Sequence, residues 1–204
     1  MPNPNVKKAR LPLSWDSKTG RYRDQNGRFV ARPIVTDARN QIVEDTRLKL
    51  RAISQQFIDG KITLVEWQLG FKDILKAGHT LAAGIAMGGK ANMTPADWGR
   101  VGQQLRVQYE ALQRFALQIE AGGKINMGRV DQYARSIRST FLNAERLRIP
   151  AQKMAQWVRT KRESCPDCIE QERRGTQPIA MFPQIGSLAC RHNCGCYLKL
   201  VRKQ

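Results

Sequence analysis

Five cysteines stand near the C-terminal end of a chain that has no others. Cys165 and Cys168 form a C-x2-C pair, and a second cluster follows with the spacing C-x3-C-x-C. That second cluster consists of Cys190, Cys194 and Cys196. A turn that carries two thiolates can supply half of a tetrahedral zinc site, and a second such turn can supply the other half. The spacing therefore predicts a structural zinc ion bound by four of these five cysteines.

A tetrahedral site needs four ligands, so one cysteine is in excess. We favour Cys190 and Cys194 as the partners of the C-x2-C pair, because two turn-like pairs are typical of zinc knuckles. The alternative uses Cys194 and Cys196, which share one face if this segment is an extended strand, and leaves Cys190 over. His192 is a further candidate to replace one of these cysteines. A disulfide within the C-x2-C pair and free thiols are the other interpretations.

The chain is strongly basic, with 35 Lys and Arg against 17 Asp and Glu in 204 residues and a net charge of +18. Such an excess indicates contact with nucleic acid, an acidic protein or another anionic surface. No apolar run reaches the roughly 18 residues of a membrane span, and the start lacks the apolar stretch of a secretory signal. We therefore expect no membrane contact and synthesis in a reducing cytoplasm, where structural disulfides are uncommon.

The segment 34–150 has the apolar periodicity of amphipathic helices, with apolar residues at steps of three and four. Four helices are expected, joined by short loops that contain glycine, which predicts an all-α bundle. Thr63 is the predicted cap of the second helix, with Glu66 three residues on as a capping box requires. Thr94 is the predicted cap of the third helix, and the fourth is expected over 127–148.

The two ends of the chain depart from this helical pattern. Residues 1–33 are basic and contain two turn signals, "TG" and "NG", which predict either an extended arm that docks on a neighbouring protein or a hairpin that packs on its own bundle. Residues 151–204 alternate like short strands on either side of a loop, and have little apolar mass. We therefore expect a mainly α fold: a helical bundle with an extended basic N-terminal arm and a small C-terminal zinc-binding lobe of α+β or loop structure.

No combination of residues predicts an enzyme. The two histidines, His79 and His192, are far apart in the sequence and provide no Ser/His/Asp arrangement. The glycines of "AGIAMGGKAN" lack the preceding strand and the Ser or Thr of a phosphate-binding loop. His79 has no second histidine at helical ligand spacing, so we expect a packed or surface side chain.

The C-terminal segment resembles a known family. A tryptophan, basic residues, "CPDC", a loop with "FPQIG" and a final "CRHNCGC" are similar to the C-terminal region of phage head-morphogenesis proteins, the Mu F-like minor head family. The similarity covers roughly 157–198, and the family's cysteines form a C-x2-C pair and a terminal C-x-C pair. In this chain those positions are Cys165, Cys168, Cys194 and Cys196. Gly195 replaces the usual Arg between the last two cysteines, and Arg191-His192 replaces the usual His-Pro step.

The resemblance implies a virion structural or head-morphogenesis protein, a minor head or connector-associated component. Such a protein is made in the host cytoplasm and is present in multiple copies in a symmetric assembly. Its partners would be capsid, portal or tail proteins, and its basic surface can also contact packaged DNA without sequence specificity. The resemblance implies no catalysis.

The alternative is a stand-alone zinc-containing nucleic-acid-binding protein. A sequence-specific regulator needs a helix or finger that presents side chains to base edges. The segment between the two cysteine clusters reads as a loop, with Gly175, Pro178, Pro183 and Gly186. The sequence therefore favours the virion protein over the regulator.

Overall fold

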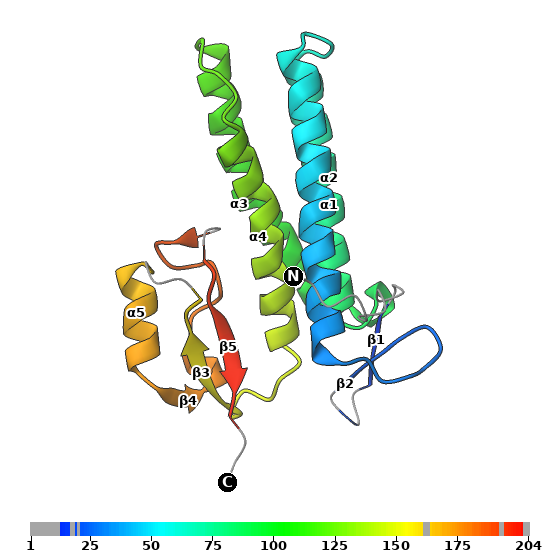
Figure 1. Ribbon diagram of the computed structural model, residues 1–204, viewed down its shortest axis with the longest axis vertical. Helices are drawn as coiled ribbons and strands as arrows, with labels where there is room; N and C mark the ends of the chain where they lie inside the picture. The colour runs from blue at the N-terminus through cyan, green and yellow to red at the C-terminus, as the bar shows by residue number, and fades with distance from the viewer. Residues whose placement is uncertain (1–12, 17–18, 20, 161–163, 192–193, 202–204) are drawn as a thin grey trace.

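The computed structural model describes residues 13–16, 19, 21–160, 164–191 and 194–201. Long helices form most of the molecule and run side by side along its longest axis (Figure 1). They are α1 (Arg32–Ile58), α2 (Leu64–Ala86), α3 (Pro95–Glu120) and α4 (Met127–Arg146). The expected mainly helical architecture is confirmed. Within the described residues, no helix combines the length and the apolar character that crossing a bilayer requires.

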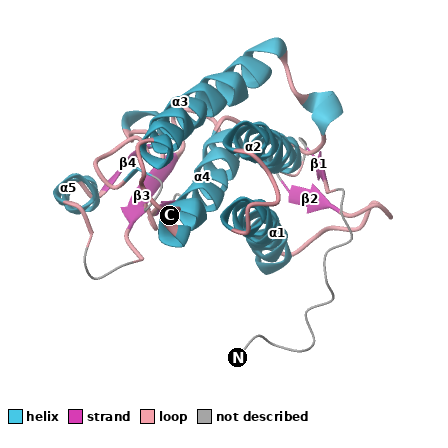
Figure 2. Ribbon diagram, turned by 90° about the horizontal axis from the view of Figure 1, so that it is seen from above, coloured by secondary structure: helices cyan, strands magenta, loops and turns pink. Residues whose placement is uncertain are grey.

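The four helices do not contact one another equally. Helices α1, α2 and α4 pack together in all three pairings, whereas α3 packs mainly on α2 and makes few contacts with α4. Seen from above, α3 lies along the outer side of α2 and α4 (Figure 2). The bundle is therefore a compact three-helix unit with a fourth helix along one side.

The predicted caps start α2 and α3. The Thr63 amide donates to Glu66 Oε2 at 2.7 Å, and the Glu66 amide donates to Thr63 Oγ1 at 3.2 Å. Thr94 and Asp97 form the same reciprocal pair. Each pair satisfies backbone donors that a helix start leaves without intrahelical partners. Helix α1 begins at Arg32, close to the start of the segment expected to be helical, and Pro33 occupies its first turn, where no amide donor is needed.

Aromatic rings fill the core between α2, α3 and α4. Trp67 is fully buried, with its ring centroid 5.2 Å from that of Phe71 and 5.7 Å from that of Phe115. Its indole N–H donates to Ser54 Oγ of α1 at 3.1 Å, so the buried polar group has a partner. Phe71 in turn meets the ring of Tyr133 edge to face. This apolar core fastens the half of the bundle that lies far from the C-terminal segment.

The described part of the N-terminal segment is a hairpin packed on the bundle. Strand β1 (Ser14–Asp16) pairs antiparallel with β2 (Arg21–Arg23). Leu13 and Tyr22 are buried, and the Tyr22 hydroxyl donates to the carbonyl of Ala86 at the end of α2. The hairpin interpretation therefore describes these residues. The rest of the predicted arm, residues 1–12, lies outside the described residues.

A small antiparallel sheet follows α4, with the strand order β4-β3-β5. Its strands are β3 (Met154–Val158), β4 (Thr176–Pro178) and β5 (Tyr197–Leu200). Helix α5 (Pro166–Arg173) lies beside β3, on the outside of the molecule (Figure 1). The expected strands on either side of the cysteines are present. The expectation of loop alone between the two cysteine clusters was wrong, because α5 starts inside the C-x2-C motif and β4 follows it. Single turns of 3-10 helix lie at Lys90–Asn92 (η1) and Ile179–Met181 (η2).

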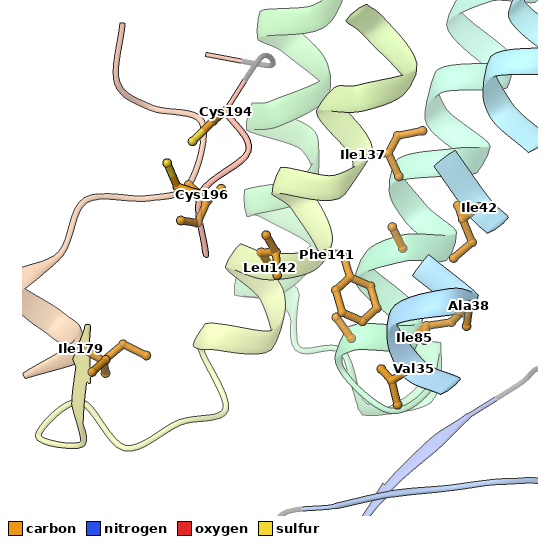
Figure 3. Packing of buried hydrophobic residues seen from close by; sticks show 14 of the residues in the cluster. Val35, Ala38, Ile42, Ile85, Ile137, Phe141, Leu142, Ile179, Cys194 and Cys196 are labelled. Carbon is orange, nitrogen blue, oxygen red and sulfur yellow. The ribbon is translucent and has the colours of Figure 1, made fainter. Parts of the chain in front are cut away.

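The sheet shares its core with the bundle. One continuous cluster of buried side chains extends from Ile42 of α1 through Phe141 and Leu142 of α4 to Ile179 and Cys196 (Figure 3). The C-terminal segment therefore lacks a separate apolar core, in agreement with its small apolar mass. Helix α4 is the element that belongs to both regions.

Candidate metal centre

The first cysteine pair lies at the start of α5. Cys165 is the residue before the helix, Pro166 occupies the first position and Cys168 lies in the first turn. Proline at this position starts a helix without losing a backbone hydrogen bond. Burial raises the pKa of the Cys165 thiol, but hydrogen bonds from the Cys168 amide and neighbouring groups outweigh it and lower that pKa overall. The helix start thus favours a thiolate at Cys165.

The second cluster is formed by a turn that leads into β5. The Arg191 amide donates to the Leu188 carbonyl at 2.8 Å, and the Cys194 amide donates to the Arg191 carbonyl at 3.0 Å. These bonds turn the chain between Cys190 and Cys194. Cys194 and Cys196 are both buried, as expected for alternate residues that share one face of an extended segment.

All five sulfurs converge on one place in the structure. The Sγ atoms of Cys165, Cys168 and Cys190 lie within 4.8 Å of one another, and so do those of Cys168, Cys194 and Cys196. Bonds of about 2.3 Å to a tetrahedral zinc ion imply sulfur–sulfur separations of about 3.8 Å. The spacing of both groups is therefore close to that of a thiolate metal site. The structure brings the five predicted residues together and leaves open which four would bind.

The sulfurs are too far apart for a disulfide. Cys168 Sγ lies 3.5 Å from Cys190 Sγ, whereas a disulfide bond is about 2.05 Å long. All five cysteines, each within the described part of the chain, are free thiols. Cys168 belongs to both sulfur groups and is 1% exposed, so it is the central member of the cluster.

Burial keeps most of these thiols neutral in the absence of a cation. It raises the pKa of Cys168 far above its usual range, raises that of Cys190 to about 12, and raises that of Cys196 as well. A bound divalent cation reverses this preference, because its positive charge stabilises thiolates and its ligands bind in the deprotonated form. The cluster can therefore hold a metal ion and would release protons on binding it.

A buried donor next to the cluster also fits a thiolate ligand. The indole N–H of Trp157 is buried and has no hydrogen-bond partner at normal length among the described residues. Burial raises the pKa of Cys196, and the Trp157 N–H acts in the opposite direction. A metal-bound thiolate at Cys196 would be an acceptor for this donor. Such support around the ligands is typical of metal sites.

An arginine of α4 faces the same region. Arg138 donates to the carbonyls of Cys194 at 2.9 Å and Gly195 at 2.8 Å, and Thr160 also donates to the Gly195 carbonyl. Burial lowers the pKa of the Arg138 guanidinium, while nearby Cys194 and Cys196 raise it. Four thiolates around a divalent ion carry a net negative charge, so a buried cation beside them provides partial compensation.

Arg138 was not among the residues predicted from the sequence. Arg138, Leu142 and Arg146 recur every four residues and so lie on one face of α4. Arg146 donates to the carbonyls of Ile179 and Pro183, each at 2.8 Å, and to that of Phe182 at 2.6 Å. Two arginines four residues either side of an apolar leucine share its helix face. This spacing was the signal in the sequence that the face contacts loop carbonyls as well as apolar side chains.

The histidines take no described part in the cluster. His192 lies outside the described residues. His79 is fully buried, as one of the two expected interpretations had it, with Nδ1 2.7 Å from Thr140 Oγ1 and Nε2 3.2 Å from Ser136 Oγ. Burial lowers its pKa to about 4, so the ring is neutral near pH 7.

Comparisons of the chain with protein-family models, with curated proteins and with solved structures find no match. The function is therefore inferred from the site, which is a buried thiol cluster with the geometry of a metal centre at the junction of α4, α5 and β5.

Proposed function

We propose that this chain is a non-catalytic structural protein of a bacteriophage virion, a minor head or connector-associated component. The observation that carries the proposal is the convergence of all five cysteines on one point, in the segment that resembles the C-terminal region of the head-morphogenesis family. Two clusters that are 22 residues apart meet at Cys168 and Cys190. A site of this kind fastens two chain segments together.

We propose zinc as the ion. Four thiolates in a tetrahedral arrangement suit zinc, which has no redox chemistry and commonly serves as a structural clamp. Apparent zinc binding of about 10–16 kcal/mol in small finger peptides would add substantially to the burial of the segment's few large apolar side chains. The ion would hold α5 and the turn before β5 against α4, and leave the bundle free to dock on capsid, portal or tail proteins.

A metal analysis tests the site, and a virion analysis tests the role. Reduced, purified protein is expected to contain about one zinc ion per chain by elemental analysis. Purified particles are expected to contain a protein of 23.2 kDa in several copies, as a component of a symmetric assembly would. Absence of the chain from particles, with the zinc present, would leave the clamp in place and remove the virion role.

A second candidate is a stand-alone zinc protein that binds a specific nucleic-acid sequence. The observation in its favour is α5, a helix that starts at the cysteine pair, as helices do in several DNA-binding zinc modules. The charge of α5 argues against it, because Asp167, Glu170 and Glu172 would face phosphates. A gel shift specific for one sequence and persistent at moderate salt would favour this candidate.

A further inference from the structure

The weak contact between α3 and α4 leaves a groove of about 670 Å³ along one side of the bundle. Its two walls are α3 and α4, and the loop of residues 184–191 closes one end. This groove is separate from the thiol cluster, although the loop that ends it leads directly into the second cysteine group. It meets the aromatic core only at Tyr133, which packs on Phe71 and also lines the groove.

The lining of the groove is cationic and polar. Its charged members are all arginines, and most of the others are glutamine, serine or asparagine; among the described residues, no carboxylate lines it. The arginines are Arg100, Arg114, Arg129 and Arg191. Facing surfaces of neighbouring helices are usually apolar, so two polar surfaces that face each other across a gap call for another occupant.

Polar residues recur along one face of each of the two helices. On α3, Gln104 and Gln108 follow Arg100 at intervals of four residues. On α4, Ser136 and Ser139 follow Arg129 at intervals of seven and three residues. Residues three, four and seven positions apart share one face of a helix. Gln108, Ser136 and Ser139 are buried, and the Ser136 hydroxyl already donates to the Tyr133 carbonyl. The exposed neutral hydrogen-bonding side chains that line the groove are Gln103, Gln184 and Ser187.

The loop at the end of the groove is held firmly on α4. Asn143 Nδ2 donates to the Ile185 carbonyl at 3.0 Å, and the Ile185 amide donates to Asn143 Oδ1 at 2.9 Å. Gly186 has a φ of +83° and approaches Ser139 so closely that a Cβ atom would lie 2.7 Å from Ser139 Oγ. The groove is therefore formed before any ligand arrives, which reduces the entropic cost of binding.

Arg191 stands in an unusual backbone conformation at this end. Its φ of +43° is rare for a residue other than glycine, and its amide and carbonyl form hydrogen bonds with Leu188 and Cys194. Strained residues of this kind persist when the surrounding structure holds them, and they are frequent at functional sites. The backbone of Arg191 lies between two turn hydrogen bonds, and its exposed side chain lines the end of the groove.

Two of the four arginines are available to a ligand. Arg100 already pairs with Asp97 at 2.9 Å, and Arg129 donates to Gln118 Oε1 at 2.6 Å. Arg114 and Arg191 have exposed side chains, and neither forms an ion pair with any described residue. A ligand with negative charge at both positions would gain two charge-assisted contacts without breaking an existing pair.

We propose that the α3–α4 groove binds the phosphodiester backbone of a nucleic acid, with Arg114 and Arg191 as the main phosphate contacts. Guanidinium groups bind phosphate oxygens through paired N–H donors, and glutamine and serine side chains supply the neutral contacts that are frequent at sugar and phosphate. The inference deepens the proposed virion role, because packaged nucleic acid is the polyanion that such a protein would meet.

The test measures binding of random-sequence DNA over a range of salt concentrations, by fluorescence anisotropy on protein of known zinc content. The variant is Arg114→Gln with Arg191→Gln. The matched control is Arg135→Gln with Arg173→Gln, two exposed arginines outside the groove that form no ion pair with any described residue. Parallel arms use duplex DNA, single-stranded DNA and polyglutamate.

For duplex DNA, the groove variant is expected to reduce the steepness of the fall of log K with log salt, where K is the association constant, by about two. Each lost phosphate contact removes about 0.9 from the magnitude of this slope. For single-stranded DNA the expected loss is about 1.4, at about 0.7 per contact. The control is expected to keep the wild-type slope with both. An equal loss in variant and control would overturn the inference in favour of a diffuse basic surface. Polyglutamate that binds as tightly as DNA, and loses that binding in the groove variant, would assign the groove to an acidic protein segment instead.

The zinc content measured on the same samples separates this inference from the proposed function. Protein without zinc that still binds DNA through Arg114 would contradict the clamp and support the groove. Protein with one zinc ion and no groove-dependent binding would support the clamp and overturn the groove.

Discussion

The two ends of α4 are stabilised by different means. Toward the loop that joins α3 and α4, this helix packs into a core of interlocking rings around Trp67 and Phe71. Toward the C-terminal segment, it presents arginines that donate to loop carbonyls, beside a cluster of thiols. Regular helices satisfy their own backbone groups, so apolar side chains suffice to join them. Irregular backbone leaves carbonyls without partners, and side-chain donors have to supply them.

The largest effect is expected from the thiol shared by both sulfur groups. Cys168→Ser should abolish the proposed zinc binding and loosen α5 and the turn before β5, because Cys168 belongs to both sulfur groups, while the shared apolar core and the arginines of α4 keep the sheet attached. Elemental analysis should show loss of zinc, and limited tryptic digestion should show new cleavage after Arg173 and Arg174. The far-UV circular dichroism of the long helices should persist.

Two further variants sharpen this prediction. Cys190→Ser and Cys196→Ser separate the two possible ligand sets, since the cysteine in excess can be replaced without loss of the ion. A Cys168→Ser protein with one zinc ion and an unchanged digestion pattern would contradict the metal clamp. It would mean that apolar packing and hydrogen bonds stabilise both ends of α4 without a metal ion.

The next largest effect belongs to the aromatic core. Trp67→Ala should lower the free energy of unfolding by about 3–5 kcal/mol, because it removes a fully buried ring and leaves a cavity. Chemical denaturation followed by helical circular dichroism measures it. The control is Val65→Ala on the exposed side of α2, which should change stability by no more than about 0.5 kcal/mol. Equal effects of the two substitutions would show that this core is not the main support.

The buried histidine makes the bundle sensitive to acid. The pKa of His79 in the folded chain, about 4, lies below its ordinary value near 6.5, so between these pH values only the unfolded chain binds the proton. The free energy of unfolding should therefore fall by about 3 kcal/mol as the pH drops from 6.5 to 4. Denaturation of the wild type and of His79→Gln across this range isolates the effect, which the variant should lack. An identical pH dependence of both proteins would contradict it.

A smaller effect is expected from the carbonyl-binding arginine at the end of α4. Arg146→Met should lower the local opening free energy of residues 179–185 by about 2 kcal/mol, because three partly buried carbonyls lose a charged donor. Hydrogen exchange measures this opening. Arg135→Met, an exposed position on the same helix, is the control and should leave exchange unchanged. Unchanged exchange in Arg146→Met would mean that the thiol cluster alone holds the segment.

Sequence patterns predicted the parts of the fold that depend on local chemistry. The caps at Thr63 and Thr94 follow from hydrogen bonds within one turn, and the long helices follow from apolar periodicity. The cysteine cluster was predicted from spacing alone, because close pairs of thiols have few other structural uses. The choice among the five was not, since it depends on where two distant turns meet.

The remaining features depend on contacts between segments that are far apart in the sequence. Helix α5 has only eight residues, too short for periodicity to reveal, and its buried face is limited to Cys168 and Gln171. The groove between α3 and α4 required knowing that these helices diverge. Polar faces on two helices do not by themselves predict a groove, because the same pattern is typical of helix faces exposed to solvent.

The two arginine anchors of α4 have a mechanical consequence. Arg138 and Arg146 are eight residues apart, about 12 Å along the helix axis, and they hold opposite parts of the C-terminal segment. A pull on β5 therefore reaches α4 first through Arg138, and a pull on the loop after β4 reaches it through Arg146. Because α4 continues into the aromatic core, tension applied to the C-terminal segment is carried by this helix toward the opposite end of the bundle.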